Sequence, residues 1–213
     1  MSGRLLDLFC GVGGAAVGYH RAGFDVVGVD IDPQPDYPFP FVQADALSLS
    51  PAYIATFDVV HASPPCQAYS ALSKGTNRNN GRTYPDLIAA TREMLRASSR
   101  RFVLENVQGA PIRRDLLLCG EWFGLSVIRH RYFEFHGYDA PAVEHRPHRG
   151  RVRGWRHGVF HEGPYVACYG AGGGKGSVAE WQTALGIDWT DHRKSLAEAI
   201  PPAYTELIGH HIR

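Results

Sequence analysis

The feature that most constrains the fold is a series of short apolar runs in the first half of the chain, separated by segments with helical periodicity. The runs predict buried strands, and the segments between them predict helices that connect one strand to the next. The predicted strands are Arg4–Phe9, Asp25–Val29, Phe57–Ala62 and Arg101–Leu104, and the predicted helices are Gly14–Ala22 and Pro85–Ser98. This alternation predicts an α/β fold with a doubly wound, mostly parallel sheet of the Rossmann-like kind.

The length of 213 residues suits one domain with a single substantial core. Hydrophobic residues make up 44% of the chain and charged residues 20%, as in a soluble globular protein. No apolar run approaches the roughly 20 residues that span a bilayer. The N-terminus enters a strand-like run within a few residues, without a basic-then-apolar leader. We therefore expect a cytoplasmic protein with no membrane partner.

The four cysteines show no CxxC pairing and no regular spacing, and the eleven histidines are scattered along the chain. Such cysteines favour reduced thiols in an intracellular enzyme over a zinc site or a disulfide framework. We expect most of the histidines to be surface or hydrogen-bonded polar residues. On this basis the sequence predicts no metal.

The net charge of +1 conceals a strong asymmetry along the chain. Residues 1–70 carry 2 basic and 7 acidic side chains, residues 71–160 carry 16 and 8, and residues 161–213 carry 4 and 6. Nearly all the basic residues are arginines, whose planar fork suits phosphate. Genomic base composition would explain arginine in place of lysine, but not the clustering, which favours a polyanionic partner at one face.

A glycine-rich turn follows the first predicted strand and opens the first predicted helix. Gly11, Gly13 and Gly14 allow backbone amides to approach a ligand, and the helix N-terminus favours its polar or anionic end. Asp30 ends the next strand, where it is placed to accept hydrogen bonds from ribose hydroxyls. The turn predicts a nucleotide-type cofactor without deciding which, because it also matches a nicotinamide or flavin fingerprint. A turn kept for tight packing is the alternative.

A cysteine, a glutamate and two arginines form a catalytic constellation. Cys66 follows two prolines at the end of a predicted strand, and its thiolate can add to C6 of a pyrimidine, which activates C5 to attack an electrophilic methyl group. Glu105 follows the next strand and can protonate N3. Arg131, two positions after Arg129 on the strand-like run Val127–Phe135, can hold the ring oxygen O2.

Each of these side chains has an ordinary explanation when taken alone: an inert buried thiol, a capping glutamate, surface arginines. Their joint occurrence at predicted strand ends favours one site, because the carboxyl ends of parallel strands meet at the same sheet edge. An amino-group methyltransferase would carry an aromatic residue after the prolines, to stack on an extruded base. Cys66 at that position therefore favours transfer to C5 over transfer to an amine.

These residues together resemble the DNA cytosine-5 methyltransferase family over about residues 4–135. The motifs that carry the resemblance, in the family's order, are Phe9-x-Gly11-x-Gly13-Gly14, Asp30-Ile31, Pro65-Cys66-Gln67, Glu105-Asn106-Val107 and Arg129-x-Arg131. The resemblance implies a methyltransferase fold that binds S-adenosylmethionine, with Phe9, Ile31 and Pro65 among the contacts. Asp45 resembles the family's acidic residue at the adenine amine, although a solvated turn aspartate fits it equally well.

The resemblance further implies double-stranded DNA as substrate, extrusion of the target base, and a monomer in a bacterial or phage-infected cell. It divides the chain into a catalytic domain (residues 1–136), a short recognition insert (137–176) and a segment that completes the catalytic domain (177–213). Three features depart from the family: Val127 replaces a glutamine, Ala199–Pro202 replaces a Gly-Asn-Ser-Val motif, and the insert is much shortened. The chain in this respect resembles compact, phage-type members.

Two regions are predicted to contact nucleic acid. In the polar loop Gln67–Thr83, which the family closes over the extruded base, the predicted contacts are Gln67, Ser70, Arg78 and Arg82; in the insert they are Arg149, Arg151, Arg153 and Trp155. Phosphate contacts bring affinity but no sequence information, so we expect relaxed or very short specificity. A disordered basic insert is the alternative. Two other functions stay open: a cytosine-C5 methyltransferase acting on RNA, single-stranded DNA or nucleotides, and a catalytically silent DNA-binding relic.

Overall fold

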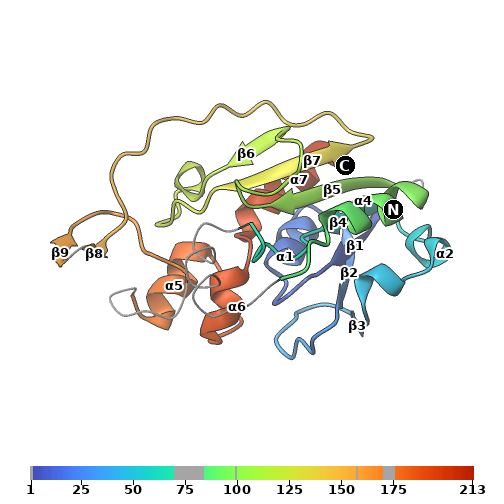
Figure 1. Cartoon of the computed structure of the whole chain (residues 1–213), viewed down its shortest axis with the longest axis horizontal. Coiled ribbons are helices and arrows are strands. Elements are labelled where there is room, and N and C mark those ends of the chain that lie inside the picture. The colour runs from blue at the N-terminus through green and yellow to red at the C-terminus, as the bar shows by residue number, and fades with distance from the viewer. Residues whose placement is uncertain (1, 70–83, 99, 157, 170–175) are drawn as a thin grey trace.

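The computed structural model describes residues 2–69, 84–98, 100–156, 158–169 and 176–213. Its main sheet has seven strands in the order β3-β2-β1-β4-β5-β7-β6, and β8 and β9 pair separately (Figure 1). The strands are β1 (Arg4–Leu8), β2 (Asp25–Asp30), β3 (Phe41–Gln43), β4 (Val59–Ala62), β5 (Arg101–Asn106), β6 (Leu116–Leu118), β7 (Arg131–His136), β8 (Gly154–Arg156) and β9 (Val159–His161). The helices are α1 (Gly14–Arg21), α2 (Pro51–Ile54), α4 (Ile88–Ala97), α5 (Val178–Leu185), α6 (Arg193–Glu198) and α7 (Pro202–Ile212), with short 3₁₀ turns η1 (Ala46–Ser48) and η2 (Gly120–Phe123).

Five neighbouring strands, from β3 to β5, run parallel. Their apolar side chains are covered on both faces, as parallel strands require. Leu8 of β1 pairs with Val29 of β2 on one side and with Ala62 of β4 on the other, and Ala62 pairs with Leu104 of β5. The strand order reverses at β1, which creates a crevice beyond the carboxyl ends of the strands. The predicted doubly wound, mostly parallel sheet is confirmed.

The far edge of the sheet is antiparallel, because β7 runs opposite to both β5 and β6. The run Val127–Phe135 was predicted as strand-like, and the strand itself covers Arg131–His136. The connection from β6 to β7 contains only η2 and a short loop, so no helix crosses over the sheet there. A short connection of this kind joins antiparallel strands.

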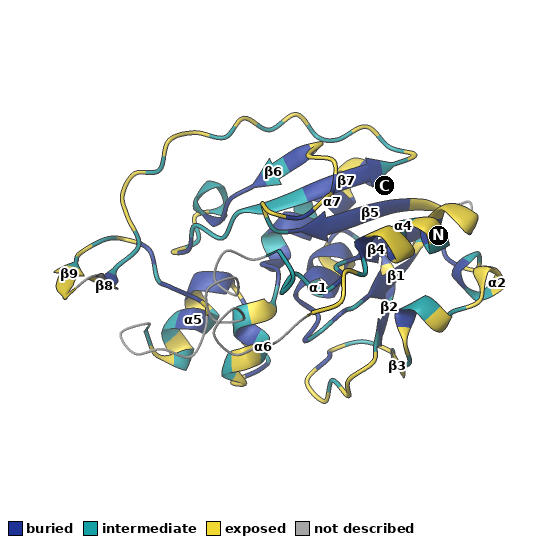
Figure 2. Ribbon diagram, in the orientation of Figure 1, coloured by how far each residue is buried: buried dark blue, intermediate teal, exposed yellow. Residues whose placement is uncertain are grey.

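Helices cover both faces of the sheet (Figure 1), and the strands between them are mostly buried (Figure 2). On one face, α1 and α7 contribute Tyr19 and Tyr204 to a core cluster. On the other face, α4 contributes Leu95 to a second cluster. Helices α1 and α7 touch closely at Gly18, where an added Cβ would lie 2.1 Å from the carbonyl oxygen of Pro202. Glycine is therefore required for this contact.

The last third of the chain contains a smaller cluster and a protruding hairpin. Helices α5 and α6 pack around the buried side chain of Trp181, with Leu196 beside it. The chain leaves β7 as a long extended segment and reaches the β8–β9 hairpin, which lies apart from the main sheet (Figure 1). Among the described residues, no helix combines the length and apolar character that crossing a bilayer requires.

Candidate active site

The site lies at the carboxyl edge of the parallel strands. The register places Phe9, Asp30, Ser63 and Glu105 at neighbouring positions along this edge, since the residues before Phe9, Ser63 and Glu105 are paired across β1, β4 and β5. Backbone hydrogen bonds carry the alignment beyond the strands: the Ser63 amide donates to Leu8 at 3.1 Å. The predicted convergence of strand-end residues is therefore present in the fold.

The glycine-rich turn has the backbone conformation that its sequence predicts. Gly11 and Gly13 have φ angles of 49° and 86°, and Phe9 has a φ of 57°, which is rare for a residue with a side chain. The Gly11 amide donates to the Asp30 carboxylate at 2.9 Å, and the second oxygen of Asp30 accepts from the Asp32 amide at 3.1 Å. Backbone strain of this kind concentrates at ligand sites.

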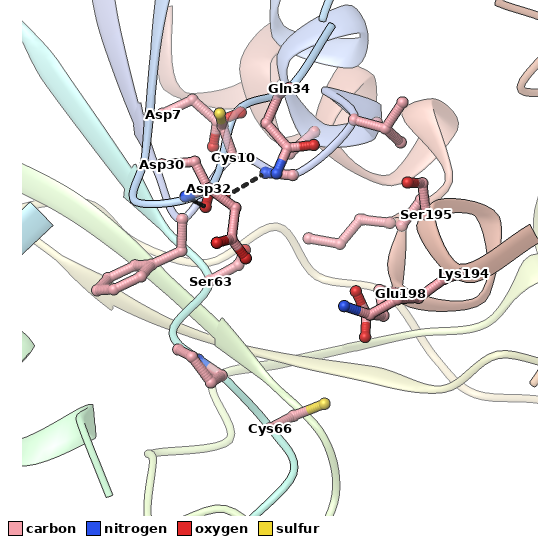
Figure 3. Close-up of a pocket in the computed structure, with 18 of the residues that line it drawn as sticks. Asp7, Cys10, Asp30, Asp32, Gln34, Ser63, Cys66, Lys194, Ser195 and Glu198 are labelled. Atoms are coloured by element: carbon pink, nitrogen blue, oxygen red, sulfur yellow. Dashed lines mark hydrogen bonds between the residues drawn. The ribbon is translucent and has the colours of Figure 1, made fainter. Parts of the chain in front are cut away.

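One cavity of about 640 Å³ connects this turn to the predicted catalytic residues (Figure 3). This volume lies in the range of small-molecule and cofactor sites. The sequence-predicted residues that line it are Phe9, Gly11, Gly14, Asp30, Ile31, Pro65, Cys66, Gln67, Glu105 and Arg131. Figure 3 shows the Cys66 sulfur turned into the space between Asp30 on one wall and Lys194 and Glu198 on the other.

An asparagine holds the turn that carries Cys66. The Asn106 side chain is buried and donates to the Pro64 carbonyl at 2.8 Å, while its oxygen accepts from the Val107 amide at 2.9 Å. Cys66 itself is partly accessible, unlike the other three cysteines, which are buried. Burial raises the pKa of the Cys66 thiol, while the positive charge of Arg131 acts in the opposite direction.

Glu105 ends β5 inside the cavity wall, with 5% of its surface exposed. Burial raises the pKa of the Glu105 carboxyl, and the charge of Arg131 and a hydrogen bond from Ser63 oppose that shift. Arg131 Nε lies 2.9 Å from Glu105 Oε1, but the contact does not have hydrogen-bond geometry, so Oε1 has no hydrogen-bond partner. The carboxyl group is therefore held in place while one oxygen keeps its capacity to bind a ligand.

A series of hydrogen-bonded side chains leads from Tyr19 through His61 to Ser63, which in turn hydrogen-bonds to Glu105. The Tyr19 hydroxyl lies 3.0 Å from His61 Nδ1, and His61 Nε2 lies 2.8 Å from the Ser63 hydroxyl. Burial lowers the pKa of His61 to about 3, so its ring is neutral near neutral pH. Sequence reasoning did not single out these residues, since a tyrosine in α1 and a histidine in β4 carry no motif.

The two predicted arginines separate in the structure. Arg131 lines the cavity beside Glu105, whereas Arg129 does not. The Arg129 guanidinium is buried and donates to the backbone carbonyls of Cys168 at 3.0 Å and Ala197 at 2.6 Å. In this arrangement Arg129 ties the C-terminal third of the chain to the start of β7, which differs from the direct catalytic contact predicted for it.

Two predicted cofactor residues also lie outside the cavity lining, namely Gly13 and Asp45. Gly13 sits at the start of α1 in a left-handed conformation. The exposed Asp45 caps η1, where its carboxylate accepts from the Leu47 amide at 3.0 Å. This local role matches the alternative of a solvated turn aspartate.

Sequence reasoning missed the wall that α6 and its flanks provide. The missed lining residues of this wall include His192, Lys194, Ser195, Glu198 and Ile200. The missed lining residues elsewhere include Asp7 on β1 and Asp32 and Gln34 after β2. Ile200 approaches the glycine turn so closely that a Cβ on Gly14 would lie 2.1 Å from its carbonyl oxygen. The only sequence signal for this wall was the place of Ala199–Pro202, where the family that the chain resembles has a Gly-Asn-Ser-Val motif that contacts the donor.

Asp7 is the most unusual of these residues. It lies on β1 with 1% of its surface exposed, and neither of its carboxyl oxygens has a hydrogen-bond partner among the described residues. Burial, assisted by the nearby negative charge of Asp30, raises the pKa of Asp7 well above its usual value. Unpartnered buried polar groups are rare, and a polar ligand group in the adjoining cavity would satisfy this one.

The model of the C-5 cytosine-specific DNA methylase family matches residues 3–115. That segment contains the glycine turn, Asp30, Cys66 and Glu105, all of which border the cavity. The chain belongs to this family.

Two curated proteins similar to this chain are type II methyltransferases. M.AquIA of Picosynechococcus sp. is 32% identical over 129 residues, which cover 51% of this chain and 50% of that protein. M.FnuDI of Fusobacterium nucleatum is 26% identical over 121 residues, which cover 53% of this chain and 34% of that protein. The chain thus spans half or less of the length of the relatives that it matches.

Solved structures confirm the Rossmann-like methyltransferase fold over the whole chain. EhMeth, a methyltransferase of Entamoeba histolytica, superposes with a TM-score of 0.64 at 13% identity and covers 100% of this chain and 98% of its own. The S. pombe Dnmt2 methyltransferase superposes with a TM-score of 0.61 at 14% identity, covering 98% of each chain. At these identities the likeness concerns the fold alone.

The described residues of the predicted insert offer mixed support for the predicted DNA contacts. Arg149 pairs with Glu121 at 2.7 Å and Arg153 pairs with Glu180 at 2.6 Å, so both charges already have acidic partners. Arg151 is exposed and lies 3.4 Å from a histidine nitrogen.

The β8–β9 hairpin in the same insert presents apolar surface to solvent. Trp155 has 65% of its surface exposed and stacks edge-on with Phe160, at 5.5 Å between ring centroids. Such a pair can stack on a base or wedge beside one. The loop residues Ser70, Arg78 and Arg82 lie outside the described residues, so their predicted contacts stay predictions.

Proposed function

We propose that the protein transfers a methyl group from S-adenosylmethionine to C5 of cytosine in DNA. The observation that carries this proposal is the single cavity bordered by the glycine turn at one end and by Cys66, Glu105 and Arg131 at the other. Membership of the C-5 cytosine-specific DNA methylase family supports it. The donor supplies an electrophilic methyl group when bound, and the chain supplies the groups that make C5 nucleophilic.

The residues at the glycine turn fit the proposed donor. Asp30 retains free lone pairs after accepting two backbone hydrogen bonds, so it can bind ribose hydroxyls. Ile31 lines the cavity with 65% of its surface exposed, which suits packing against a flat purine. The unpartnered carboxyl of Asp7 offers a further polar contact on the cavity wall.

In the proposed mechanism, Cys66 Sγ forms a bond to C6 of the pyrimidine while Glu105 delivers a proton to N3. Arg131 places its positive charge near O2, where negative charge would otherwise build up. It also favours the thiolate form of Cys66. Once C5 has taken the methyl group that the donor would supply, loss of the C5 proton to a base breaks the bond between sulfur and C6, the N3 proton returns to Glu105, and the methylated base is released. The raised pKa of Glu105 suits this role, because it increases the protonated fraction near neutral pH.

We propose duplex DNA, with the target base extruded, as the substrate. The alternative substrates are RNA, single-stranded DNA and nucleotides. They stay open because a short insert would suffice to recognise them. We further propose that the protein acts as a monomer in the cytoplasm. The description of the matching family, C-5 cytosine-specific DNA methylase, favours DNA.

The decisive experiment incubates the protein with labelled S-adenosylmethionine and, separately, duplex DNA, single-stranded DNA, RNA and cytidine nucleotides. We expect label at cytosine C5 in duplex DNA and none with Cys66→Ala. Cys168→Ala, which removes a buried thiol outside the cavity, is the matched control. Label in RNA or nucleotides alone would reassign the substrate. Intact donor binding without label in any acceptor would overturn the enzyme assignment in favour of a silent relic.

Donor binding can be tested separately from methyl transfer by calorimetry with S-adenosylhomocysteine. Asp30→Ala removes a carboxylate that lines the cavity, and we expect it to weaken binding by about tenfold or more, the equivalent of one charge-assisted hydrogen bond. Asp139→Ala is the matched control, because Asp139 is exposed and lies outside the cavity lining. Equal losses in both variants would contradict the assignment of Asp30.

A further inference from the structure

Four potential metal ligands converge outside the methyl-transfer cavity. Cys119 directly follows β6, His130 directly precedes β7, and His145 and His148 lie on the segment between β7 and β8. One ligand atom from each of the four side chains lies within 4.8 Å of the other three. The sequence predicted no metal, because its cysteines form no CxxC pair and its histidines are scattered; these four residues follow the spacing Cys-x10-His-x14-His-x2-His. The fold assembles the group by pairing β6 with β7 and bringing the following segment back.

The distances within the group match the edges of a small coordination tetrahedron. His130 Nε2 lies 2.9 Å from His145 Nε2 and 3.2 Å from His148 Nε2, and Cys119 Sγ lies 3.4 Å from His148 Nε2. Zinc bonds of about 2.0–2.1 Å to nitrogen and 2.3 Å to sulfur imply ligand–ligand edges of roughly 3.3–3.6 Å. Small movements of these side chains, apart where two ligand atoms are closer than such an edge and together where they are farther apart, would therefore accommodate one ion.

Hydrogen bonding among the side chains explains this convergence less well than a cation does. Each neutral imidazole has one protonated and one unprotonated nitrogen. His130 Nε2 contacts the Nε2 atoms of both His145 and His148, but in a neutral ring it carries either one proton or one lone pair, so it cannot make a full hydrogen bond to both. The ring planes of His145 also stand at 72° and 84° to those of His130 and His148. Rings that radiate steeply from a shared point are typical of ligands around a metal.

The surroundings favour a closed structural site. Cys119 is fully buried, and the three histidines are partly buried. Trp122 lies beside His145, at 5.7 Å between ring centroids, and Tyr165 lies beside His148 at 6.4 Å. Four protein ligands leave no open coordination position for a substrate or a reactive water. One thiolate with three imidazoles is a donor set that zinc accepts readily.

We propose that Cys119, His130, His145 and His148 bind one zinc ion. The ion would fasten the segment that follows β7 to the β6–β7 edge of the sheet. His130 lies between Arg129 and Arg131, so the same ion would fix the entry to β7 from which Arg131 reaches the cavity. The proposal does not depend on methyl transfer, since it concerns only these four side chains.

The test uses the full chain without a histidine tag, stripped of metal and then titrated with Zn²⁺ or Co²⁺ alone. We expect one Zn²⁺ per chain and, with Co²⁺, the intense visible bands of tetrahedral coordination together with a sulfur-to-cobalt charge-transfer band. Cys119→Ser and His148→Ala should each weaken Zn²⁺ binding by more than about 100-fold, because even outer-shell partners contribute about 10- to 100-fold. Chelation should lower the Tm of the wild-type protein but not of these variants.

Matched controls separate this site from incidental binding. Cys66→Ala should retain the charge-transfer band, and His210→Ala, which removes an exposed histidine of α7, should retain full affinity. If Cys119→Ser does not fold, His145→Ala provides the same test from the segment outside the sheet. A folded wild-type protein that binds neither ion at micromolar concentrations would overturn the proposal. Binding that the ligand variants leave unchanged would also overturn it.

Discussion

At the residue scale, burial favours the protonated forms of Cys66 and Glu105, the two groups proposed to act on the pyrimidine. The pKa of each is raised mainly by removal from water, and for each the charge of Arg131 partly offsets the shift. A thiol with a raised pKa reacts slowly unless a cation or a ligand changes its surroundings. Arg131 is therefore the residue through which the reactivity of this pair can be altered experimentally.

Alkylation of Cys66 should be slow at pH 7 and rise steeply only above pH 9, because the pKa of the thiol is raised from a reference value of 9.0. Arg131→Gln should shift the midpoint to still higher pH, since it removes a charge that favours the thiolate. Mass spectrometry of the Cys66 peptide after timed exposure to iodoacetamide measures both rates. A wild-type midpoint near pH 7 would contradict a raised pKa of the Cys66 thiol, and no shift in the variant would contradict the effect of Arg131 on it.

The stability of the protein should also depend on Glu105. Because its folded-state pKa is raised, the folded state is favoured while the carboxyl is protonated, and this contribution is lost as pH rises through that pKa. Wild-type stability should therefore fall relative to that of Glu105→Gln as pH increases from about 4 towards neutrality. Urea unfolding of both proteins across this range provides the measurement. A difference that stays constant or changes in the opposite direction would show that the ion pair with Arg131 dominates.

At the element scale, the C-terminal third of the chain completes the cavity that the parallel strands begin. Arg129 anchors this third through the carbonyls of Cys168 and Ala197. Trp189 fastens it to the glycine turn, because its indole nitrogen donates to the Val12 carbonyl at 2.8 Å. Elements far apart in the sequence thereby share one wall.

Trp189→Phe should destabilise the protein by about 1 kcal/mol, the usual contribution of one hydrogen bond, and should weaken binding of S-adenosylhomocysteine through the glycine turn. Trp155→Phe is the matched control, because Trp155 is exposed on the β8–β9 hairpin and far from this contact in the sequence. Urea unfolding and calorimetry report the two effects. A Trp189 variant that behaves like the Trp155 variant would show that the contact does not position the turn.

The four strands and two helices predicted in the first half agree with β1, β2, β4, β5, α1 and α4 to within a few residues, whereas β3 and α2 were not predicted. Continuous apolar runs indicate buried strands, and helical periodicity indicates the helices between them. The strand predicted at Phe57–Ala62 begins at Val59, and the helix predicted from Pro85 begins at Ile88. The antiparallel pairing of β7 could not be predicted in this way. Its direction depends on the short path through η2, whereas the strand pattern is the same for both directions.

At the scale of the whole molecule, the basic insert carries less free charge than its sequence indicates. Intramolecular acids neutralise Arg149 and Arg153, and Arg151 is the exposed guanidinium between them. The Trp155 and Phe160 rings instead give the hairpin an exposed apolar surface. Among the described arginines of this region, Arg146 and Arg151 are exposed and have no acidic partner within the described part of the chain, so phosphate contacts should depend most on these two.

Arg151→Gln should reduce the slope of log affinity for duplex DNA against log salt by about 1, the value expected for one phosphate contact. Arg149→Gln should reduce it by less, because that guanidinium must first leave Glu121. Fluorescence anisotropy across a series of salt concentrations measures both slopes. Equal reductions would show that the ion pair opens on binding, and no reduction in either variant would remove the insert from the interface.

The sequence alone determined the parallel half of the fold and the core of the site, because a parallel sheet brings every residue that follows a strand to one edge. Gly11, Asp30, Cys66 and Glu105 are connected by that rule, whatever the rest of the chain does. Only the tertiary structure decided the contacts that no period or spacing encodes. It moved Arg129 away from the cavity, brought α6 to it, and gathered Cys119 with three distant histidines. These outcomes depend on how loops return across the sheet, and that path is fixed by packing of the whole chain.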